Sequence, residues 1–364
     1  MSEFKFKDLG AEKNAEIEEA RSATHTTCRV TVPALEEIMY RPIAVLDHGS
    51  LSVLNYMGDD STIVSNARVS YGKGTKKVSE DATLIEYLLR HRHTTPFEGC
   101  EIQFRCHMPI FVARQWIRHR TANVNEYSAR YSILSNEFYV PEVENLLAQS
   151  QNNKQGRAGA PIVEAGDVRS MIRMHGEISY LMYQWLLNSE EMPDEKVQWG
   201  SINKSTNYGE MMQDSFEEFF ERRANKEYAG IARELARMVM PVNGYTTWTW
   251  KIDLHNLLHF LSLRNDPHAQ YEIRVYAEQM WKVVQTWVPA AAAAFQNVRM
   301  DGISLTGRQL RVLQLAMTRD MSNDQSFTFA GAIERIDYEW AKEAIPGLGK
   351  REFEEMKTAV TKGL

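Results

Sequence analysis

Residues 101–120, EIQFRCHMPIFVARQWIRHR, change their periodicity at Pro109. Before the proline every second residue is apolar, which predicts a strand with one buried face. After it, apolar residues recur at helical spacing beside a stripe of polar and cationic residues. The stretch therefore predicts a strand that leads directly into a helix whose polar side suits a pocket wall. The residues expected to be buried are Ile102, Phe104, Cys106, Val112, Ala113, Trp116 and Ile117.

The segments on either side continue this mixture of strands and helices. Short apolar runs predict strands at 42–47 and 245–252. Helical periodicity, with capping residues or proline at several ends, predicts the helices. The expected helices are 59–70, 80–91, 168–187, 231–241 and 253–284, the last divided near Pro267. The expected irregular segments are an ordered loop at 121–132, a flexible connector at 141–166 and an insertion at about 190–225.

The composition limits the classes of protein to consider. The chain has 364 residues, and 42 lysines and arginines against 48 aspartates and glutamates give a formal net charge of −6. Hydrophobic residues make up 43%, as in a soluble globular protein, and the length allows two domains or one large domain with appendages. The mild acidity argues against a general nucleic-acid binder, so an anionic ligand must be bound by a local group of cations.

The cysteines and the N-terminus indicate a compartment. The three cysteines, Cys28, Cys100 and Cys106, show no C-x-x-C spacing, which supports neither a disulfide framework nor a zinc site and favours a reducing environment. The N-terminus is charged, and no stretch reaches the ~18 apolar residues of a membrane span. We therefore expect a cytoplasmic protein without a membrane partner.

The most unusual stretch begins at the end of the helix predicted after Pro109. Arg118, His119 and Arg120 are consecutive, so on a helix they point about 100° apart and converge only if the helix ends there. Two arginines provide planar forks for phosphate or carboxylate, and Ser128 with nearby backbone N–H groups can complete an anion cradle. The alternative is a solvated basic helix end that faces carboxylates of a neighbouring element.

A second group contains Asp253, His255 and His259, with the two histidines four positions apart on one helix face. Metal sites use this spacing, and Asp253 could add an oxygen ligand. The residues between the histidines include no glutamate, unlike the metalloprotease helix. We therefore favour a histidine pair that hydrogen-bonds a cofactor or another side chain, and no metal.

Two further arginines, Arg237 and Arg264, lie on different predicted helices and could converge on one anionic ligand. The chain lacks both glycine-rich nucleotide fingerprints, so any nucleotide is held by other means. The helix that carries Arg237 is expected to bury Ile231, Leu235, Met238 and Val239.

Arg118 to Arg120, residues 121–127 and Ser128 form the pattern Arg-His-Arg, seven residues, serine, which resembles the signature of the flavin-dependent thymidylate synthases. Further blocks resemble that family in the family's order, from about Pro42 to Trp287. These blocks are HRHTTPFEG (91–99), FVARQWIRHR (111–120), NEYSARYS (125–132), ARMVMP (236–241) and LRNDPHAQYE (263–272). Several ordered blocks are more specific than one motif, and they cover most of the chain.

The resemblance implies an α+β fold with a central mixed or antiparallel sheet flanked by helices, assembled as a homotetramer. It also implies reductive methylation of dUMP to dTMP. Methylenetetrahydrofolate would give the carbon, reduced FAD would give the hydride, and NADPH would re-reduce the flavin. The family needs neither a cysteine nucleophile nor a Rossmann fingerprint, which agrees with the residues of this chain.

The resemblance further assigns roles to individual residues. Those expected around dUMP are Gln115, Trp116, Ile117, Arg118, Glu126, Tyr127, Ser128, Ala129, Arg130, Arg237 and Arg264. Those expected to hold FAD are Thr95, Arg118, His119, Arg120, Glu126, Asp253, Leu254, His255 and His259, with His93 near the flavin and folate. Arg264 is expected against the uracil edge as the catalytic residue, because a fixed cation stabilises the N3-deprotonated base and raises electron density at C5.

The matching blocks also favour one domain with appendages. They place the catalytic domain at 43–286, including the insertion, between an N-terminal arm at 1–42 and a helical C-terminal extension at 287–364. Two other functions stay open at this point. A metal-dependent hydrolase would act through the group that begins at Asp253, and a nucleotide or RNA binder would use the loop after Arg118.

Overall fold

The computed structural model describes residues 4–69, 78–151, 156–188, 229–321 and 333–362. The chain divides into two compact units, Met1–Ala292 and Ala293–Leu364. The predicted catalytic domain at 43–286 stays a prediction, because its boundaries concern which residues carry the activity and not which residues pack together. In the part of the chain that is described, no helix is long and apolar enough to cross a lipid bilayer.

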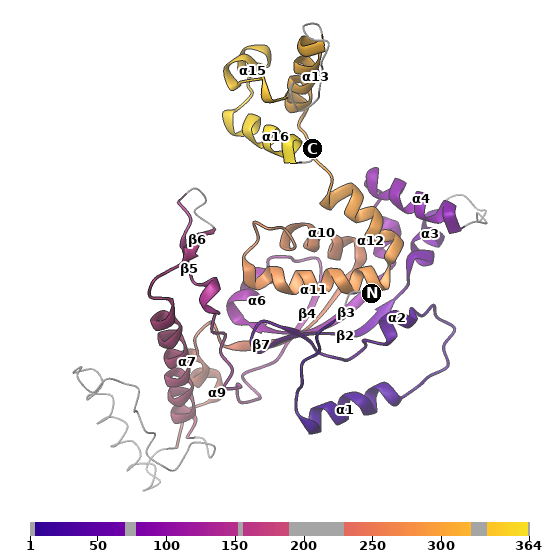
Figure 1. Cartoon of the computed structure of the whole chain (residues 1–364). Coiled ribbons are helices and arrows are strands. Elements are labelled where there is room, and N and C mark those ends of the chain that lie inside the picture. The colour runs from indigo at the N-terminus through magenta and orange to yellow at the C-terminus, as the bar shows by residue number, and fades with distance from the viewer. Residues whose placement is uncertain (1–3, 70–77, 152–155, 189–228, 322–332, 363–364) are drawn as a thin grey trace. The chain divides into compact units, whose positions relative to one another are not determined.

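A five-stranded sheet forms the centre of the first unit (Figure 1), in the order β1-β2-β3-β7-β4. Every neighbouring pair in this order is antiparallel. The predicted α+β fold with an antiparallel central sheet is therefore confirmed. The strands are β1 (Ile43–Val45), β2 (Gly49–Met57), β3 (Glu101–Pro109), β7 (Tyr245–Asp253) and β4 (Asn123–Glu126).

The central strand β3 alternates as its sequence predicts. Ile102, Phe104 and Cys106 are buried on one face, and the residues between them are partly or fully exposed. β7 pairs with β3 so that Phe104 lies opposite Trp250, and β7 alternates in the same way. The sheet therefore has one apolar face, which needs a cover, and one polar face.

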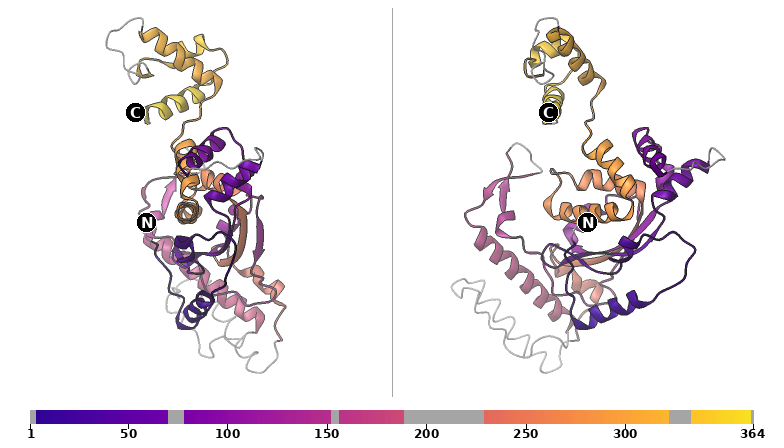
Figure 2. Two further views of the ribbon diagram at one scale, coloured as in Figure 1. Left: turned by 90° about the vertical axis from the view of Figure 1, so that its right-hand side faces the viewer. Right: turned by 45° about the vertical axis from the view of Figure 1, so that its right-hand side comes forward.

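Three helices cover the apolar face (Figure 2): α6 (Ile110–Trp116), α10 (Leu254–Arg264) and α11 (Tyr271–Trp287). They meet in an aromatic cluster around Trp116, whose ring centroid lies 5.2 Å from that of Trp250 and 5.0 Å from that of Phe260. Large aromatic rings bury much apolar area, so this cluster fixes the end of α6 against α10. Ile117 was expected to be buried but is exposed, because α6 ends one residue before it.

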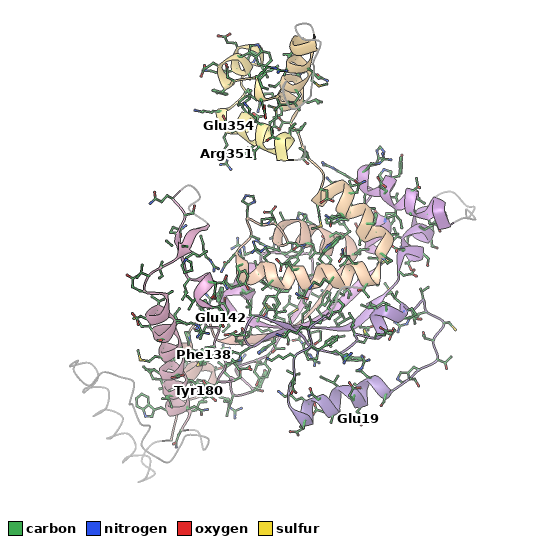
Figure 3. The ribbon with its side chains drawn as sticks, in the orientation of Figure 1. Glu19, Phe138, Glu142, Tyr180, Arg351 and Glu354 are labelled. Atoms are coloured by element: carbon green, nitrogen blue, oxygen red, sulfur yellow. The ribbon has the colours of Figure 1, made fainter. Side chains whose placement is uncertain are left out.

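The other elements of the first unit lie around this centre. α3 begins at a capping box in which the Asp59 carboxylate accepts the Thr62 N–H at 3.1 Å. Phe138 lies against Gly176 in the long helix α7 (Figure 3). The bounds are α1 (Ala11–Ser22), α2 (Pro33–Glu36), α3 (Asp60–Arg68), α4 (Val78–Arg90), α5 (Thr95–Glu98), η2 (Val143–Asn145) and α7 (Ala165–Leu187). After β7 and its helices comes α12 (Pro289–Phe295), which crosses into the second unit.

The structure corrects several expectations about local structure. β2 forms where no strand is predicted, and β4 occupies part of the predicted loop at 121–132. The predicted connector at 141–166 contains a hairpin of β5 (Leu147–Gln149) and β6 (Arg157–Pro161). Strand formation depends on pairing partners, which a local pattern does not contain. The predicted insertion at about 190–225 lies outside the described residues.

The predicted helix at 231–241 is shorter than expected. It consists of α9 (Arg233–Ala236) and the 3-10 turn η3 (Arg237–Val239). The expectation that Ile231, Leu235 and Met238 point inward is wrong for the single chain, because all three side chains are exposed. This segment therefore presents apolar side chains to its surroundings.

The two ends of the chain differ in how they are held. In the N-terminal arm, the Lys5 carbonyl accepts the Ala44 N–H at 2.7 Å, so the arm lies along the edge strand β1. The second unit has an apolar core of its own, which includes Val312, Phe353 and Met356. Its elements are η4 (Gln296–Met300), α13 (Gly307–Met321), α15 (Tyr338–Ala344) and α16 (Lys350–Lys362).

Candidate functional site

The Arg-His-Arg segment directly follows α6. The helix ends at Trp116, and the His119 N–H donates to the Trp116 carbonyl at 2.9 Å in a turn outside the helix. The Trp116 side chain is fully buried and anchors this end of α6 in the core. The helix thus ends before Arg118. This end is what the sequence predicted, because three consecutive polar side chains can converge only outside a helix.

His119 joins this segment to α10. Its ring centroid lies 5.5 Å from that of His259 and 5.4 Å from that of Phe260, and its Nε2 shares a hydrogen bond with the Thr121 hydroxyl at 3.2 Å. Burial lowers the pKa of His119, and repulsion from His259 and Arg264 lowers that pKa further. His119 is therefore a neutral imidazole near pH 7.

We call Arg118, His119, Arg120, His259 and Arg264 the histidine cluster. Its three arginines form no ion pair or hydrogen bond with any residue that the structure describes. Burial lowers the pKa of Arg264, but a guanidinium stays charged at physiological pH. Arg118 and Arg120, which flank His119 in the sequence, are exposed, and Arg264 is half-buried. These unpaired cations suit an anionic ligand.

Strand β4 and the turn after it position the second half of the motif. The Glu126 carboxylate accepts the Thr246 hydroxyl at 2.8 Å, and the Tyr127 N–H continues the pairing with β7. The Arg130 N–H then donates to the Ser128 hydroxyl at 3.3 Å, which is a turn stabilised by its own side chain. The segment is therefore ordered, as predicted, although part of it is strand.

α9 and η3 bring two predicted arginines together. Arg130 forms an ion pair with Glu234 at 3.4 Å, and the Arg237 side chain donates to the Glu234 carbonyl at 3.3 Å. Nearby, Arg233 donates to the Tyr131 carbonyl at 2.6 Å and so ties the turn to α9. We call Arg130 and Arg237 the arginine cluster. The Arg130–Glu234 pair is exposed on both sides, so it is weak and can yield to a stronger anion.

The two clusters are separate within one chain. No hydrogen bond, ion pair or ring contact between described residues joins the histidine cluster to the arginine cluster. The convergence of Arg237 and Arg264 on one ligand therefore stays a prediction.

His93 lies in the turn that precedes α5, and Thr95 is the first residue of that helix. Arg92 has a positive φ of 58°, which lets the chain reverse direction after α4. The exposed His93 ring lies edge-on to Tyr87, with centroids 6.1 Å apart. Because α5 packs against α10, this turn borders the helix that carries His259.

Several predicted residues do not offer a free side chain. Trp116, Ala129 and Leu254 are buried, so they can meet a ligand only through their backbone or by positioning neighbours. Asp253 caps α10, and its two oxygens accept the backbone and side-chain N–H groups of Asn256 at 2.9 and 2.7 Å.

Other predicted residues do have a free polar or exposed side chain. Gln115 has a buried Oε1 without a hydrogen-bond partner among the described residues. Ile117, Tyr127 and Arg130 are exposed, and His255 is half-buried near the start of α10.

The structure gives no geometric support to the hydrolase alternative. Within the described ranges, no three or more histidine, cysteine, aspartate or glutamate side chains are arranged to hold a metal ion. Asp253, His255 and His259 therefore do not converge as a metal site requires.

Two cavities lie elsewhere. One of about 330 Å³ is lined by Asp47 and Arg173 among others, and an apolar one of about 610 Å³ is lined by residues that include Tyr139 and Glu272. None of the predicted site residues lines either cavity.

Two residues that support this site were not predicted from the sequence. Glu234 lies three positions before Arg237, which places both on one helix face, but its ion pair is with Arg130 of another segment, which local spacing does not indicate. Thr246 carries no local signal, because its bond to Glu126 depends on the pairing of β4 with β7.

Comparison with known proteins adds independent evidence. Residues 52–290 match the family model described as "Thymidylate synthase complementing protein". The flavin-dependent thymidylate synthase of Gluconobacter oxydans is 46% identical over 349 residues, which cover 96% of this chain and 97% of that protein. The enzyme of the same name from Rickettsia bellii is 48% identical over 334 residues, which cover 91% of this chain and 98% of that protein. Among solved structures, a UMP/dUMP methylase, PolB from Streptomyces cacaoi bound with 5-Br dUMP, matches with a TM-score of 0.53 and 28% identity, over 71% of this chain and 98% of that chain.

Proposed function

Because this chain belongs to the flavin-dependent thymidylate synthase family, we propose that it converts dUMP to dTMP by reductive methylation. The carbon donor in this proposal is methylenetetrahydrofolate, and the reductant of the bound flavin is NADPH. The proposal assigns the activity to residues 43–286, which largely coincide with the stretch that matches the family model.

One observation carries the proposal. The Arg-His-Arg segment and α10 are far apart in the sequence, yet His119 packs against His259 and feels the charge of Arg264. A solvated basic helix end would pair with carboxylates of a neighbouring element, and the three arginines of the histidine cluster form no ion pair with a described residue. The arrangement therefore favours a built anion site over a solvated surface.

The donor set of the histidine cluster fits FAD. Arg118 and Arg120 can bind the diphosphate in planar, charge-assisted hydrogen bonds. The neutral His119 can accept or donate a single hydrogen bond without adding charge. When bound and reduced, FAD supplies the hydride for the new methyl group. The other residues proposed to hold it are Thr95, Glu126, Asp253, Leu254, His255 and His259.

The arginine cluster suits the phosphate of dUMP. Arg130 contacts the carboxylate of Glu234 and Arg237 its backbone carbonyl, and the turn at Ser128 offers a hydroxyl and backbone N–H groups. A phosphate dianion attracts Arg130 more strongly than the exposed Glu234 carboxylate does, so substrate can displace the ion pair.

Arg264 is proposed to act on the uracil base. A cation at the edge of the base stabilises the N3-deprotonated form and so favours attack by C5 on the one-carbon unit. Its burial strengthens this effect, because charges interact more strongly where water is excluded. Gln115, which lies just before the Arg-His-Arg segment and has a buried Oε1 without a described partner, is also proposed to border dUMP.

A homotetramer is part of the proposal. Ile231, Leu235 and Met238 are exposed beside the arginine cluster, and exposed apolar groups of this kind mark contact surfaces. A second copy that covers them could also bring its histidine cluster to this arginine cluster. His93, on the exposed turn before α5, is proposed to lie near the flavin and the folate.

The test uses the purified, full-length protein. We expect a yellow sample with a flavin absorption band, and conversion of dUMP to dTMP only when FAD, NADPH and methylenetetrahydrofolate are all present. A protein that binds no flavin, or that forms dTMP without the folate, would contradict the proposal.

A further inference from the structure

Glu272 is an almost fully buried carboxylate in the first turn of α11, with an exposed fraction of 3%. It accepts the Tyr139 hydroxyl at 3.2 Å and the Gln270 side-chain N–H at 2.9 Å, and it forms an ion pair with Arg157. Burial alone raises the pKa of Glu272, but the bonds from Arg157 and Gln270 outweigh burial and leave that pKa below its usual value. Glu272 is therefore ionised at neutral pH and holds all three donors.

The three donors come from three different segments. Arg157 lies in the β5–β6 hairpin and also donates to the Asn145 carbonyl at 2.9 Å. Tyr139 precedes α7, and Gln270 is the last residue of the turn between α10 and α11. That turn begins directly after Arg264. Glu272 thus fastens the start of α11, at the far end of the turn that follows Arg264, to two segments far away in the sequence.

The turn between α10 and α11 depends on such bonds. On one side Arg274 donates to the Pro267 carbonyl at 3.0 Å. On the other side lies the apolar cavity of about 610 Å³, whose lining includes Tyr139, Gln270 and Glu272. Because a cavity provides no packing atoms, close packing does not fix the turn there. Hydrogen bonds within the turn, such as that from the Ala269 N–H to the Asp266 carbonyl at 2.9 Å, hold its shape, and the bonds of Glu272 tie its last residue to the rest of the unit.

We propose that Glu272 and Arg157 are positioning residues for Arg264: the buried ion pair holds the α10–α11 turn and thereby sets where the Arg264 guanidinium lies. The inference rests on the proposed function, in which Arg264 stabilises the N3-deprotonated base. A displaced cation stabilises that anion less, and misplacement of about 1 Å can lower a rate on the order of 100-fold.

The test replaces Arg157 by methionine, which keeps the length of the side chain and removes the ion pair. We expect Arg157→Met to lower kcat at least about tenfold while the KM for dUMP changes less than about threefold, as for an interaction used in the transition state. The pH at which kcat reaches half its maximum should rise, because the base then loses its proton less easily.

Two milder variants grade the effect. Arg157→Lys should restore part of kcat. Tyr139→Phe, which removes one hydroxyl, should shift the same pH in the same direction by a smaller amount.

Arg169→Met is the matched control. Arg169 lies on α7 and pairs with Glu142, labelled in Figure 3, at 3.0 Å without touching the turn. Its replacement should leave both kcat and the pH profile unchanged. If Arg157→Met lowered kcat without moving the pH profile, or left kcat unchanged, the positioning role would be wrong although the proposed function stood. A wild-type protein without dTMP formation would contradict the proposed function and this inference with it.

Discussion

At the residue scale, the site depends on where charge is left uncompensated. Arg118, Arg120 and Arg264 form no ion pair with a described residue, whereas Arg130 is held by an exposed and therefore weak ion pair with Glu234. Burial keeps His119 neutral, so it adds no further repulsion. A net acidic chain can in this way present two local groups of cations to anionic ligands.

Arg264→Ala should keep FAD and lose most turnover. The substitution removes the cation proposed to stabilise the deprotonated base, but it leaves the cations proposed for the FAD diphosphate in place. Flavin absorbance of the purified variant and its rate of dTMP formation check both parts. Arg114→Ala, a change at an exposed arginine of α6, is the control and should retain the wild-type rate. Full activity of Arg264→Ala would refute the assigned role.

Arg130→Ala should weaken dUMP binding by about 1.5–3 kcal/mol, because one charge-assisted hydrogen bond to phosphate is lost. Titration calorimetry with dUMP measures the change. Glu234→Gln should strengthen dUMP binding or leave it unchanged, because it frees Arg130 from its ion pair. An unchanged affinity in Arg130→Ala would show that the phosphate lies elsewhere.

At the scale of elements, the end of α6 was predictable and its partner was not. Consecutive polar residues after Trp116 indicate that the helix stops, and the alternation in β3 indicates one buried face. The contact of His119 with α10 depends on the order of strands in the sheet, which no local pattern contains. The hairpin of β5 and β6 was missed for the same reason, because its short strands are stabilised by each other and by Arg157.

Trp116→Ala should lower the free energy of unfolding by about 3–5 kcal/mol, as expected for a large aromatic side chain removed from a core. It should also weaken FAD binding, because the Arg-His-Arg segment loses its anchor. Chemical denaturation and flavin titration measure the two effects. Trp287→Ala replaces an equally buried tryptophan of α11. It should lower the free energy of unfolding by a similar amount, but this variant should bind FAD more tightly than Trp116→Ala does. Equal FAD affinities in the two variants would argue against the anchoring role.

At the scale of the whole molecule, the class of fold was predicted correctly from the sequence. Which apolar residues lie on the surface was predicted less well. The segment around α9 was expected to bury its apolar residues, and it exposes them. A helical pattern shows which residues share a face, but it does not show whether that face meets its own core or another chain. Exposed apolar residues beside the arginine cluster are what an assembly of several copies requires.

Leu235→Glu should therefore disrupt the proposed tetramer, because it places a charge in the apolar contact. Sedimentation analysis should give four chains of 41.9 kDa each for the wild type and smaller species for the variant. Leu315→Glu, at an exposed leucine of α13 in the second unit, serves as the control and should leave the assembly intact. A wild-type monomer with full activity would be inconsistent with shared active sites.

The central claim is that this chain replaces the hydrogen at C5 of dUMP by a methyl group. Release of tritium from 5-tritiated dUMP, measured with FAD, NADPH and methylenetetrahydrofolate, follows that replacement directly. The account predicts tritium release that parallels dTMP formation in the wild type and is strongly reduced in Arg264→Ala. Tritium that stays on the nucleotide in the complete wild-type reaction would contradict it.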